Sequence, residues 1–252
     1  MEGLTVGQFS LIYNAFSFGT ATFAAATLFL WFGRSQVSAH YKTALTISGL
    51  VTFIAFYHYW RIFDSWGAAY DVVDGVVTAT GAPFNVAYRY VDWLLTVPLL
   101  LIELILVMRL TQSETVSKSV SLGAAAALMI VLGYPGEVSG GIDNTRLLWG
   151  ALSMIPFLYI VYTLYVGLGE AIARQPEGAR GLVRMARNLT VLAWFFYPVV
   201  YFAPFVLPLS GGTSTAVIEV GYTIADITAK AVFGVLIYMI AVRKTEAEAG
   251  HA

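Results

Sequence analysis

The sequence predicts an all-α membrane protein, a bundle of seven transmembrane helices. Of the 252 residues, 58% are hydrophobic and only 12% are charged, whereas soluble domains carry about 25% charged residues. Apolar segments of about 20 residues, the length that crosses the hydrocarbon core of a bilayer, recur along the chain. They fall at 8–32, 42–63, 85–109, 117–136, 145–169, 186–207 and 216–242. We expect a single domain over residues 1–252, with 245–252 as a disordered polar tail.

The charge and the cysteine count exclude several classes of protein. A formal net charge of -1 gives no indication of a nucleic-acid partner. The absence of cysteine excludes disulfides, thiolate chemistry and cysteine-based metal sites. No basic segment with a small-residue cleavage site precedes the first apolar segment, so we expect no removed signal peptide.

Lysine and arginine residues are unevenly shared between the two ends of the expected helices. If the N-terminus lies outside, ten of the 14 fall in cytoplasmic loops or helix ends, and only Arg61 and Arg146 fall outside. Because cytoplasmic loops carry the excess of positive charge, this distribution predicts an external N-terminus and a cytoplasmic C-terminus. The loop from Ser65 to Phe84, between the second and third helices, is rich in Gly and Val and predicts a short β-hairpin outside the bilayer.

The last apolar segment contains a lysine, Lys230, with Asp226 one helical turn before it. A charge at mid-bilayer costs at least ~2.5 kcal/mol, so it indicates a functional site. Lysine forms Schiff bases with carbonyl compounds, and the pair favours a covalently bound aldehyde chromophore with a carboxylate beside it. The alternative from another class is a seven-helix receptor or carrier for a diffusible ligand, in which Lys230 is only the salt-bridge partner of Asp226.

The third expected helix carries a polar stripe. At about 100° per residue, Arg89, Thr96 and Glu103 all lie within roughly 60° of Asp92 around the helix. Glu103 lies ~16 Å from Asp92 along the axis, about half the bilayer. Two carboxylates so spaced can serve as stations on either side of a central proton carrier. Hydrogen bonding between helices is the alternative, and it stays open above all for Thr96.

Buried aromatic residues and one histidine admit two interpretations. His58 on the second helix is either a hydrogen-bonded structural group or a partner that tunes when Asp92 accepts a proton. Trp93, Trp194 and Tyr197 either pack the bundle or form flat walls around a polyene. Pro198 predicts a kink in the sixth helix.

Two of these segments resemble motifs of the microbial rhodopsins, and the resemblance extends over the whole chain. Asp226-Ile227-Thr228-Ala229-Lys230 resembles the retinal-attachment motif, and Arg89-Tyr90-Val91-Asp92-Trp93-Leu94-Leu95-Thr96 resembles the counterion motif. The resemblance implies a Schiff base of all-trans retinal on Lys230, with Asp92 as primary counterion and proton acceptor and Asp226 as second counterion. It also implies that Arg89 is a charged gate on their outer side.

The third-helix residues narrow the resemblance. Asp92, Thr96 and Glu103 resemble the Asp-Thr-Glu pattern of bacterial proton pumps of the proteorhodopsin and xanthorhodopsin type, and this resemblance implies that Glu103 is the proton donor. His58 and the long loop resemble the xanthorhodopsin-like branch. In some members of that branch a glycine on the fifth helix opens the retinal pocket to a carotenoid antenna; Gly150 is at that position here, although a membrane-helix glycine also serves close packing. The remaining pocket positions that the resemblance implies are Trp93, Leu100, Met129, Gly133, Trp194, Tyr197, Pro198 and Tyr222.

The resemblance implies a light-driven outward proton pump, an ion transporter and not an enzyme, in the bacterial cell membrane. Lipid and protons are then its partners, and related proteins form pentamers or hexamers. A photosensor that signals to a transducer is the nearest alternative, but Glu103 argues against it. The residues leave open whether Glu219 releases protons to the outside or is a solvated charge at a helix end.

Overall fold

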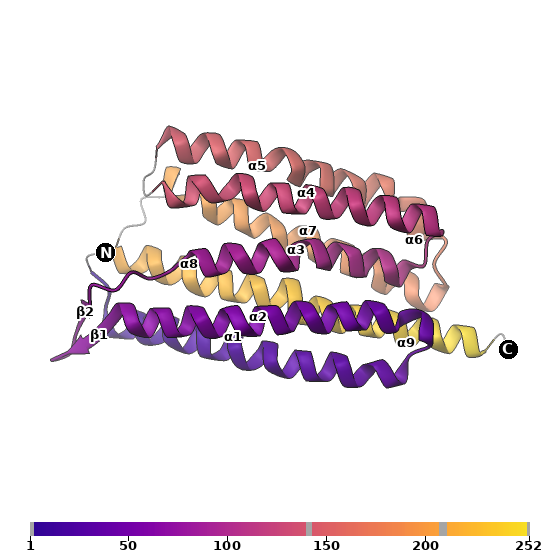
Figure 1. Cartoon of the computed structure of the whole chain (residues 1–252), viewed down its shortest axis with the longest axis horizontal. Coiled ribbons are helices and arrows are strands. Elements are labelled where there is room, and N and C mark those ends of the chain that lie inside the picture. Colours follow the sequence, from indigo (N-terminus) through magenta and orange to yellow (C-terminus); the bar gives the residue numbers. More distant parts are fainter. Residues whose placement is uncertain (1–2, 140–142, 207–210, 251–252) are drawn as a thin grey trace.

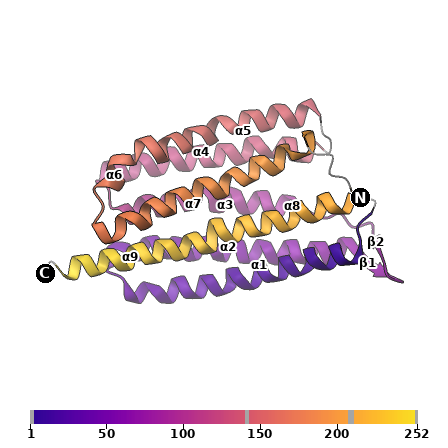
Figure 2. The ribbon, with the colours of Figure 1, turned by 180° about the vertical axis from the view of Figure 1, so that it is seen from behind.

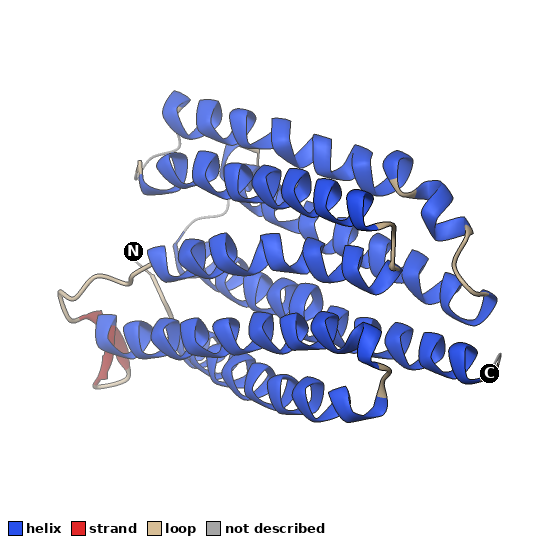
Figure 3. Ribbon diagram, turned by 45° about the vertical axis from the view of Figure 1, so that its right-hand side comes forward, coloured by secondary structure: helices blue, strands red, loops and turns tan. Residues whose placement is uncertain are grey.

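The computed structural model describes residues 3–139, 143–206 and 211–250, and their helices lie side by side along one axis (Figures 1 and 3). The first described residues and the β-hairpin lie at one end of the bundle, and the last helix ends at the other (Figure 1). In the described part of the chain, 3-10 turns η1 and η2 join the first two helices. The helices and turns of the first half are α1 (Val6–Gly33), η1 (Arg34–Gln36), η2 (Ala39–Tyr41), α2 (Lys42–Ala69), α3 (Ala87–Met108) and α4 (Gln112–Val138).

The second half of the bundle contains interrupted helices. The fifth helix changes to a π-helical turn, η3, and then continues as α6. The seventh is one long helix whose middle, η5, is also π-helical. The elements are α5 (Asn144–Tyr162), η3 (Thr163–Gly167), α6 (Gly169–Ala173), α7 (Glu177–Phe202), η4 (Ala203–Phe205), α8 (Gly211–Asp226), η5 (Ile227–Val232) and α9 (Phe233–Ala249).

The described helices confirm the seven expected segments. Five helical stretches, belonging to α1, α3, α4, α5 with η3, and α8 through α9, are both long and apolar enough to cross a membrane. The other two, α2 and α7, are as long but more polar. The helix α7 begins nine residues before the expected apolar segment, because a helix continues past the bilayer wherever its backbone stays hydrogen-bonded.

The hairpin after α2 is confirmed. Its strands, β1 (Tyr70–Val73) and β2 (Val76–Ala79), pair antiparallel with Tyr70 opposite Ala79 and Val73 opposite Val76. Asp74 and Gly75 form the two-residue turn with φ of 52° and 77°, the conformation for which Asp-Gly is favoured. The expected start of the loop at Ser65 is wrong, because residues 65–69 form the end of α2.

The expectation of a disordered tail over 245–252 is wrong for residues 245–249, which belong to α9. Glu248 accepts hydrogen bonds from Tyr41 at 2.5 Å, Ser38 at 3.0 Å and Arg109 at 2.9 Å. Three partners from two other segments hold this last turn in place. Residues 251–252 lie outside the described part of the chain.

The helices form a closed ring. Consecutive helices from α1 to α5 pack against each other, and the seventh helix contacts both α1 and α7 (Figure 2). Apolar side chains fill most of the interior of the described bundle. A few charged side chains are also buried there: Arg89, Asp92, Glu103, Glu219, Asp226, Lys230 and Lys244.

Candidate functional site

Lys230 lies at the centre of the bundle between two carboxylates. Its Nζ is 2.5 Å from Asp92 Oδ2 on α3 and 2.7 Å from Asp226 Oδ1 on its own helix. The side chains of all three are 1% exposed. A buried ammonium is stable only when opposite charges and hydrogen bonds replace its water. The predicted pairing of Lys230 with Asp226 is therefore present, and Asp92 joins it from the third helix.

The backbone around Lys230 is π-helical from Ile227 to Val232. Such a turn contains one residue more than an α-helical turn and is frequent at functional sites. It begins directly after Asp226 and encloses Lys230. The sequence contains no proline or glycine in this turn that would have predicted it.

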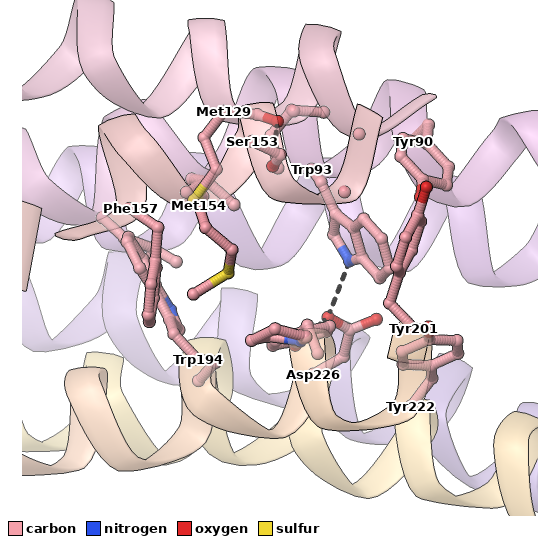
Figure 4. A pocket seen from close by; sticks show the side chains of 18 of the residues that line it. Tyr90, Trp93, Met129, Ser153, Met154, Phe157, Trp194, Tyr201, Tyr222 and Asp226 are labelled. Atoms are coloured by element: carbon pink, nitrogen blue, oxygen red, sulfur yellow. Dashed lines mark hydrogen bonds between the residues drawn. The ribbon is translucent and has the colours of Figure 1, made fainter. Parts of the chain in front are cut away.

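Three neutral donors surround Asp226. Tyr197 donates to Oδ1 at 2.7 Å, Trp93 Nε1 donates to Oδ1 at 3.1 Å, and Tyr59 donates to Oδ2 at 2.8 Å. Figure 4 shows the contact between Trp93 and Asp226. Hydrogen bonds of this kind stabilise the charged form of a carboxylate and fix its orientation.

Asp92 has fewer partners. Its Oδ1 is buried and accepts no hydrogen bond within the described protein, and His58 Nδ1 lies 3.7 Å away. His58 Nδ1 instead lies 2.9 Å from the carbonyl oxygen of Ile54 in its own helix. Thr96 likewise donates to the Asp92 backbone carbonyl at 2.8 Å. The structure thus brings His58 and Thr96 beside Asp92, without a hydrogen bond from either to its carboxylate.

Arg89 pairs with Glu219. Arg89 Nη2 lies 2.5 Å from Glu219 Oε2, and the guanidinium lies 4.8 Å from the centre of the Tyr222 ring. Glu219 is only 6% exposed, so its interpretation as a solvated helix-end charge is wrong. A single carboxylate within an apolar segment gave no indication that its partner would be an arginine on the third helix.

Glu103 lies in a separate buried position on α3. It is 0% exposed, and Ser48 on α2 donates a short hydrogen bond to its Oε2. Its Oε1 has no partner within the described protein. Ser48 was not predicted as a site residue, because a serine in a membrane helix does not by itself indicate a site.

A narrow cavity of about 90 Å³ extends from Lys230 between α3, α4, α5 and α7. All of the pocket residues that the resemblance implied line it: Trp93, Leu100, Met129, Gly133, Gly150, Trp194, Tyr197, Pro198, Tyr222 and Lys230. The labelled aromatic rings of Trp93, Trp194 and Tyr222 lie around it (Figure 4). The cavity has further lining residues that were not predicted from the sequence: Tyr90, Val97, Ile130, Ser153, Met154, Phe157, Tyr201, Phe202 and Ala229.

Helical spacing could have identified some of the missed residues. Ser153, Met154 and Phe157 follow Gly150 by three, four and seven positions, so they share its face of α5. Gly150 itself lies against α7: a Cβ there would be 2.5 Å from Tyr201 Cε1 and 2.7 Å from Phe202 Cζ. The lining is mostly apolar, with Lys230 and Asp226 at one end, which suits a flat conjugated molecule attached to the lysine.

Comparisons with known proteins agree with this arrangement. The family model described as bacteriorhodopsin-like protein matches residues 11–244. The green-light absorbing proteorhodopsin of gamma-proteobacterium EBAC31A08 is 34% identical over 232 residues, which are 90% of this chain and 84% of the relative. Bacteriorhodopsin of Halobacterium salinarum is 30% identical over 92% of this chain and 84% of its own length.

Solved structures are also similar. The structure of xanthorhodopsin, described as a light-driven ion pump with dual chromophore, has a TM-score of 0.94 and 50% identity, with 98% of each chain covered. A thermophilic rhodopsin has a TM-score of 0.92 and 45% identity, with 97% of this chain and 98% of the other covered. The chain is a multi-pass membrane protein of the bacteriorhodopsin-like family, in the group of microbial rhodopsins that includes the proteorhodopsins and xanthorhodopsin, and this family binds retinal through a lysine.

Proposed function

We propose that the protein is a light-driven pump that moves protons outward across a bacterial cell membrane. The arrangement of charges along α3 carries the proposal. Lys230 Nζ lies 2.5 Å from Asp92 Oδ2. A second buried carboxylate, Glu103, follows Asp92 on α3, whereas Arg89, which pairs with Glu219 on α8, precedes it. Lys230 is the residue that would hold retinal, which supplies the absorption of light and a change of shape. The apolar lining and the lysine at its end support this assignment.

The two carboxylates near Lys230 have different tasks. Asp226 has three neutral donors besides Lys230, which favour its charged form, so it is the fixed counterion. Asp92 Oδ2 faces Nζ while its Oδ1 is unpaired, so it can accept a proton from Nζ with little rearrangement. Asp92 is therefore the acceptor, and His58, 3.7 Å away, is placed to influence its protonation.

Glu103 is the donor for the return of a proton to Nζ. Its complete burial with one hydroxyl partner favours the neutral, proton-carrying carboxylic acid, because an isolated buried carboxylate is costly. Thr96 lies between the two carboxylates on the same face of α3 and is fully buried, so it spaces them without adding charge. Moving each proton against 100 mV requires about 2.3 kcal/mol.

The outward direction depends on the orientation of the chain. The excess of Lys and Arg at the end where α3 finishes supports a cytoplasmic position for that end, and hence an external N-terminus. Glu103 then faces the cytoplasm, and the Arg89–Glu219 pair faces the outside. Arg89 separates Asp92 from the outer side, which supports its assignment as a charged gate.

A pH electrode in a suspension of retinal-supplied cells tests the function. Illumination is expected to acidify the medium, and an uncoupler is expected to abolish the signal. Lys230→Ala cells should show neither colour nor acidification. A visible pigment that leaves the pH of the medium unchanged would favour a photosensor, and a colourless protein would favour a receptor for a diffusible ligand.

We also propose that Gly150 admits a carotenoid beside the retinal ring. Gly150 lines the cavity and lies against the rings of Tyr201 and Phe202, which a carotenoid would have to displace, and the similar xanthorhodopsin is described as having a dual chromophore. Adding a hydroxylated carotenoid should add its bands to the excitation spectrum of pumping, and Gly150→Trp should remove them. Unchanged spectra of the wild-type protein would refute the antenna. Pentamers or hexamers, which are common among related proteins, are proposed on the resemblance alone, and native mass spectrometry tests them.

A further inference from the structure

A second buried lysine, Lys244, has no task in the mechanism above. It lies on α9, 14 residues after Lys230, and is 5% exposed. Its ammonium makes three hydrogen bonds, to the carbonyl oxygens of Val107 at 2.9 Å and Met108 at 3.2 Å and to Gln175 Oε1 at 2.8 Å. All three donors of the ammonium are thus used, and every acceptor is a neutral oxygen.

The two carbonyls belong to the last residues of α3, where helical hydrogen bonding ends. A cation at this position satisfies both carbonyls and interacts favourably with the helix dipole. The next residue, Arg109, has φ of 53°, so the chain turns sharply away from the helix axis here. Lys244 therefore joins the helix of Lys230 to the end of the helix that contains Asp92 and Glu103.

Gln175 joins a third part of the fold to the same point. It lies between α6 and α7, is 6% exposed, and its Nε2 donates to Met108 O at 3.1 Å and to Ala171 O at 3.0 Å. The Met108 carbonyl thus accepts from both Lys244 and Gln175. A helix cap needs neither burial nor a partner from a third segment. Lys244 and Gln175 therefore also hold α9 and the α6–α7 connection against the end of α3.

The cluster of Lys244, Gln175 and Met108 lies near Glu103 on the same end of α3. Lys244, Gln175 and Met108 line an open cleft of about 1150 Å³ at this end of the bundle, together with charged side chains such as Arg174 and Glu177. Glu103 precedes Met108 by five residues, or ~7.5 Å along the helix, and is fully buried. The cluster lies between the open cleft and the proposed proton donor.

We propose that Lys244 and Gln175 form a clasp that closes the cleft off from Glu103, so that Lys244 is a positioning residue for proton uptake. The clasp holds the end of α3 against α9 and the α6–α7 turn, and Glu103 exchanges its proton with the cytoplasm only while the clasp is open. This inference rests on the proposed function.

Lys244→Met tests the clasp, with Arg243→Met as the matched control. Arg243 is the adjacent residue of the same helix, is 59% exposed in its side chain, and pairs only with Glu246 among the described salt bridges. Losing the buried charged hydrogen bonds should make opening easier by about tenfold or more. We expect that Lys244→Met raises amide hydrogen exchange at residues 104–109 in the dark by this factor and speeds flash-induced proton uptake, reported by a pH dye. Proton release and the dark absorption maximum should not change.

Two further variants separate the clasp from general damage. Lys244→Arg keeps a donor for the carbonyls and should restore slow exchange and slow uptake. Gln175→Met should have the effect of Lys244→Met, and the double variant should add little to either. Equal effects of Arg243→Met and Lys244→Met, or unchanged uptake in a folded Lys244→Met pigment, would overturn the proposal. If the wild-type protein moves no protons, the proposed function fails, whereas the exchange measurement still tests the clasp.

Discussion

Arg89 and Glu219 form a buried ion pair, with Arg89 Nη2 2.5 Å from Glu219 Oε2. Glu219 offsets the arginine charge one turn of α3 away from Asp92. The two carboxylates at Lys230 therefore face that ammonium without a direct hydrogen bond from the guanidinium. The pair joins α3 to α8 on the side of Asp92 that lies toward the beginning of α3.

Glu219→Gln should destabilise the protein strongly. It leaves the Arg89 guanidinium buried without its counter-charge, which costs about 3–5 kcal/mol in comparable cases. Thermal denaturation of the purified pigment measures the loss. The control is Glu137→Gln, whose partner Arg146 lies at 3.1 Å and whose side chain is 21% exposed compared with 8% for Glu219. Equal shifts of Tm for the two variants would contradict the importance of burial.

Asp92→Asn should abolish light-driven acidification of the medium. The amide keeps the shape of the side chain but cannot accept a proton from Lys230 Nζ, 2.5 Å away. A pH electrode in illuminated suspensions gives the result. Asp64→Asn, which changes an exposed carboxylate on α2, should pump normally. Undiminished pumping by Asp92→Asn would refute its role as acceptor.

Glu103→Gln should slow recovery of the visible absorption after a flash by roughly 100-fold or more, the range for loss of a general acid. Ser48→Ala removes the hydroxyl that donates to Glu103 and should slow the same step by a smaller factor. Flash photolysis at neutral pH measures both. Ser35→Ala, which changes an exposed serine in η1, is the control. A Glu103→Gln cycle of normal speed would count against the donor.

Alkaline stability should depend on Tyr41, which lies in η2 outside the membrane spans. Burial, and then the hydrogen bond to Glu248, raises the pKa of Tyr41 to about 12, compared with about 10 in an unfolded chain. The stabilisation that its neutral hydroxyl contributes is complete below the unfolded value and is lost as the pH rises through the folded value.

Tyr41→Phe has no such group to ionise. Its Tm should be lower than that of the wild type at neutral pH, because the hydrogen bond is lost, and the difference should narrow between about pH 10 and 12. Tyr162→Phe, at a 62% exposed position on α5, is the control. A constant difference between Tyr41→Phe and wild type across this window would contradict the role of Tyr41.

Much of the site was predictable because its information is local. The positions of Arg89, Asp92, Thr96 and Glu103 on one face follow from helical periodicity, and all four are buried. The position of Lys230 within an apolar segment indicated a site because an unpaired charge there is costly. By contrast, the π-helical turn at Lys230 and the ordered last turn of α9 depend on contacts that no local pattern contains.

The sequence by itself determined where the seven helices lie, that a hairpin follows the second helix, and that Arg89, Asp92, Glu103, Asp226 and Lys230 lie inside the bundle; the burial of Glu219 and Lys244 was not predicted. Only the tertiary structure decided which partners they find: Tyr59 for Asp226, Ser48 for Glu103, Glu219 for Arg89, and the end of α3 for Lys244. The physical reason is that burial and periodicity belong to a single helix. A hydrogen bond between helices depends on how each is rotated and shifted against its neighbours, and packing of the whole bundle sets that relation.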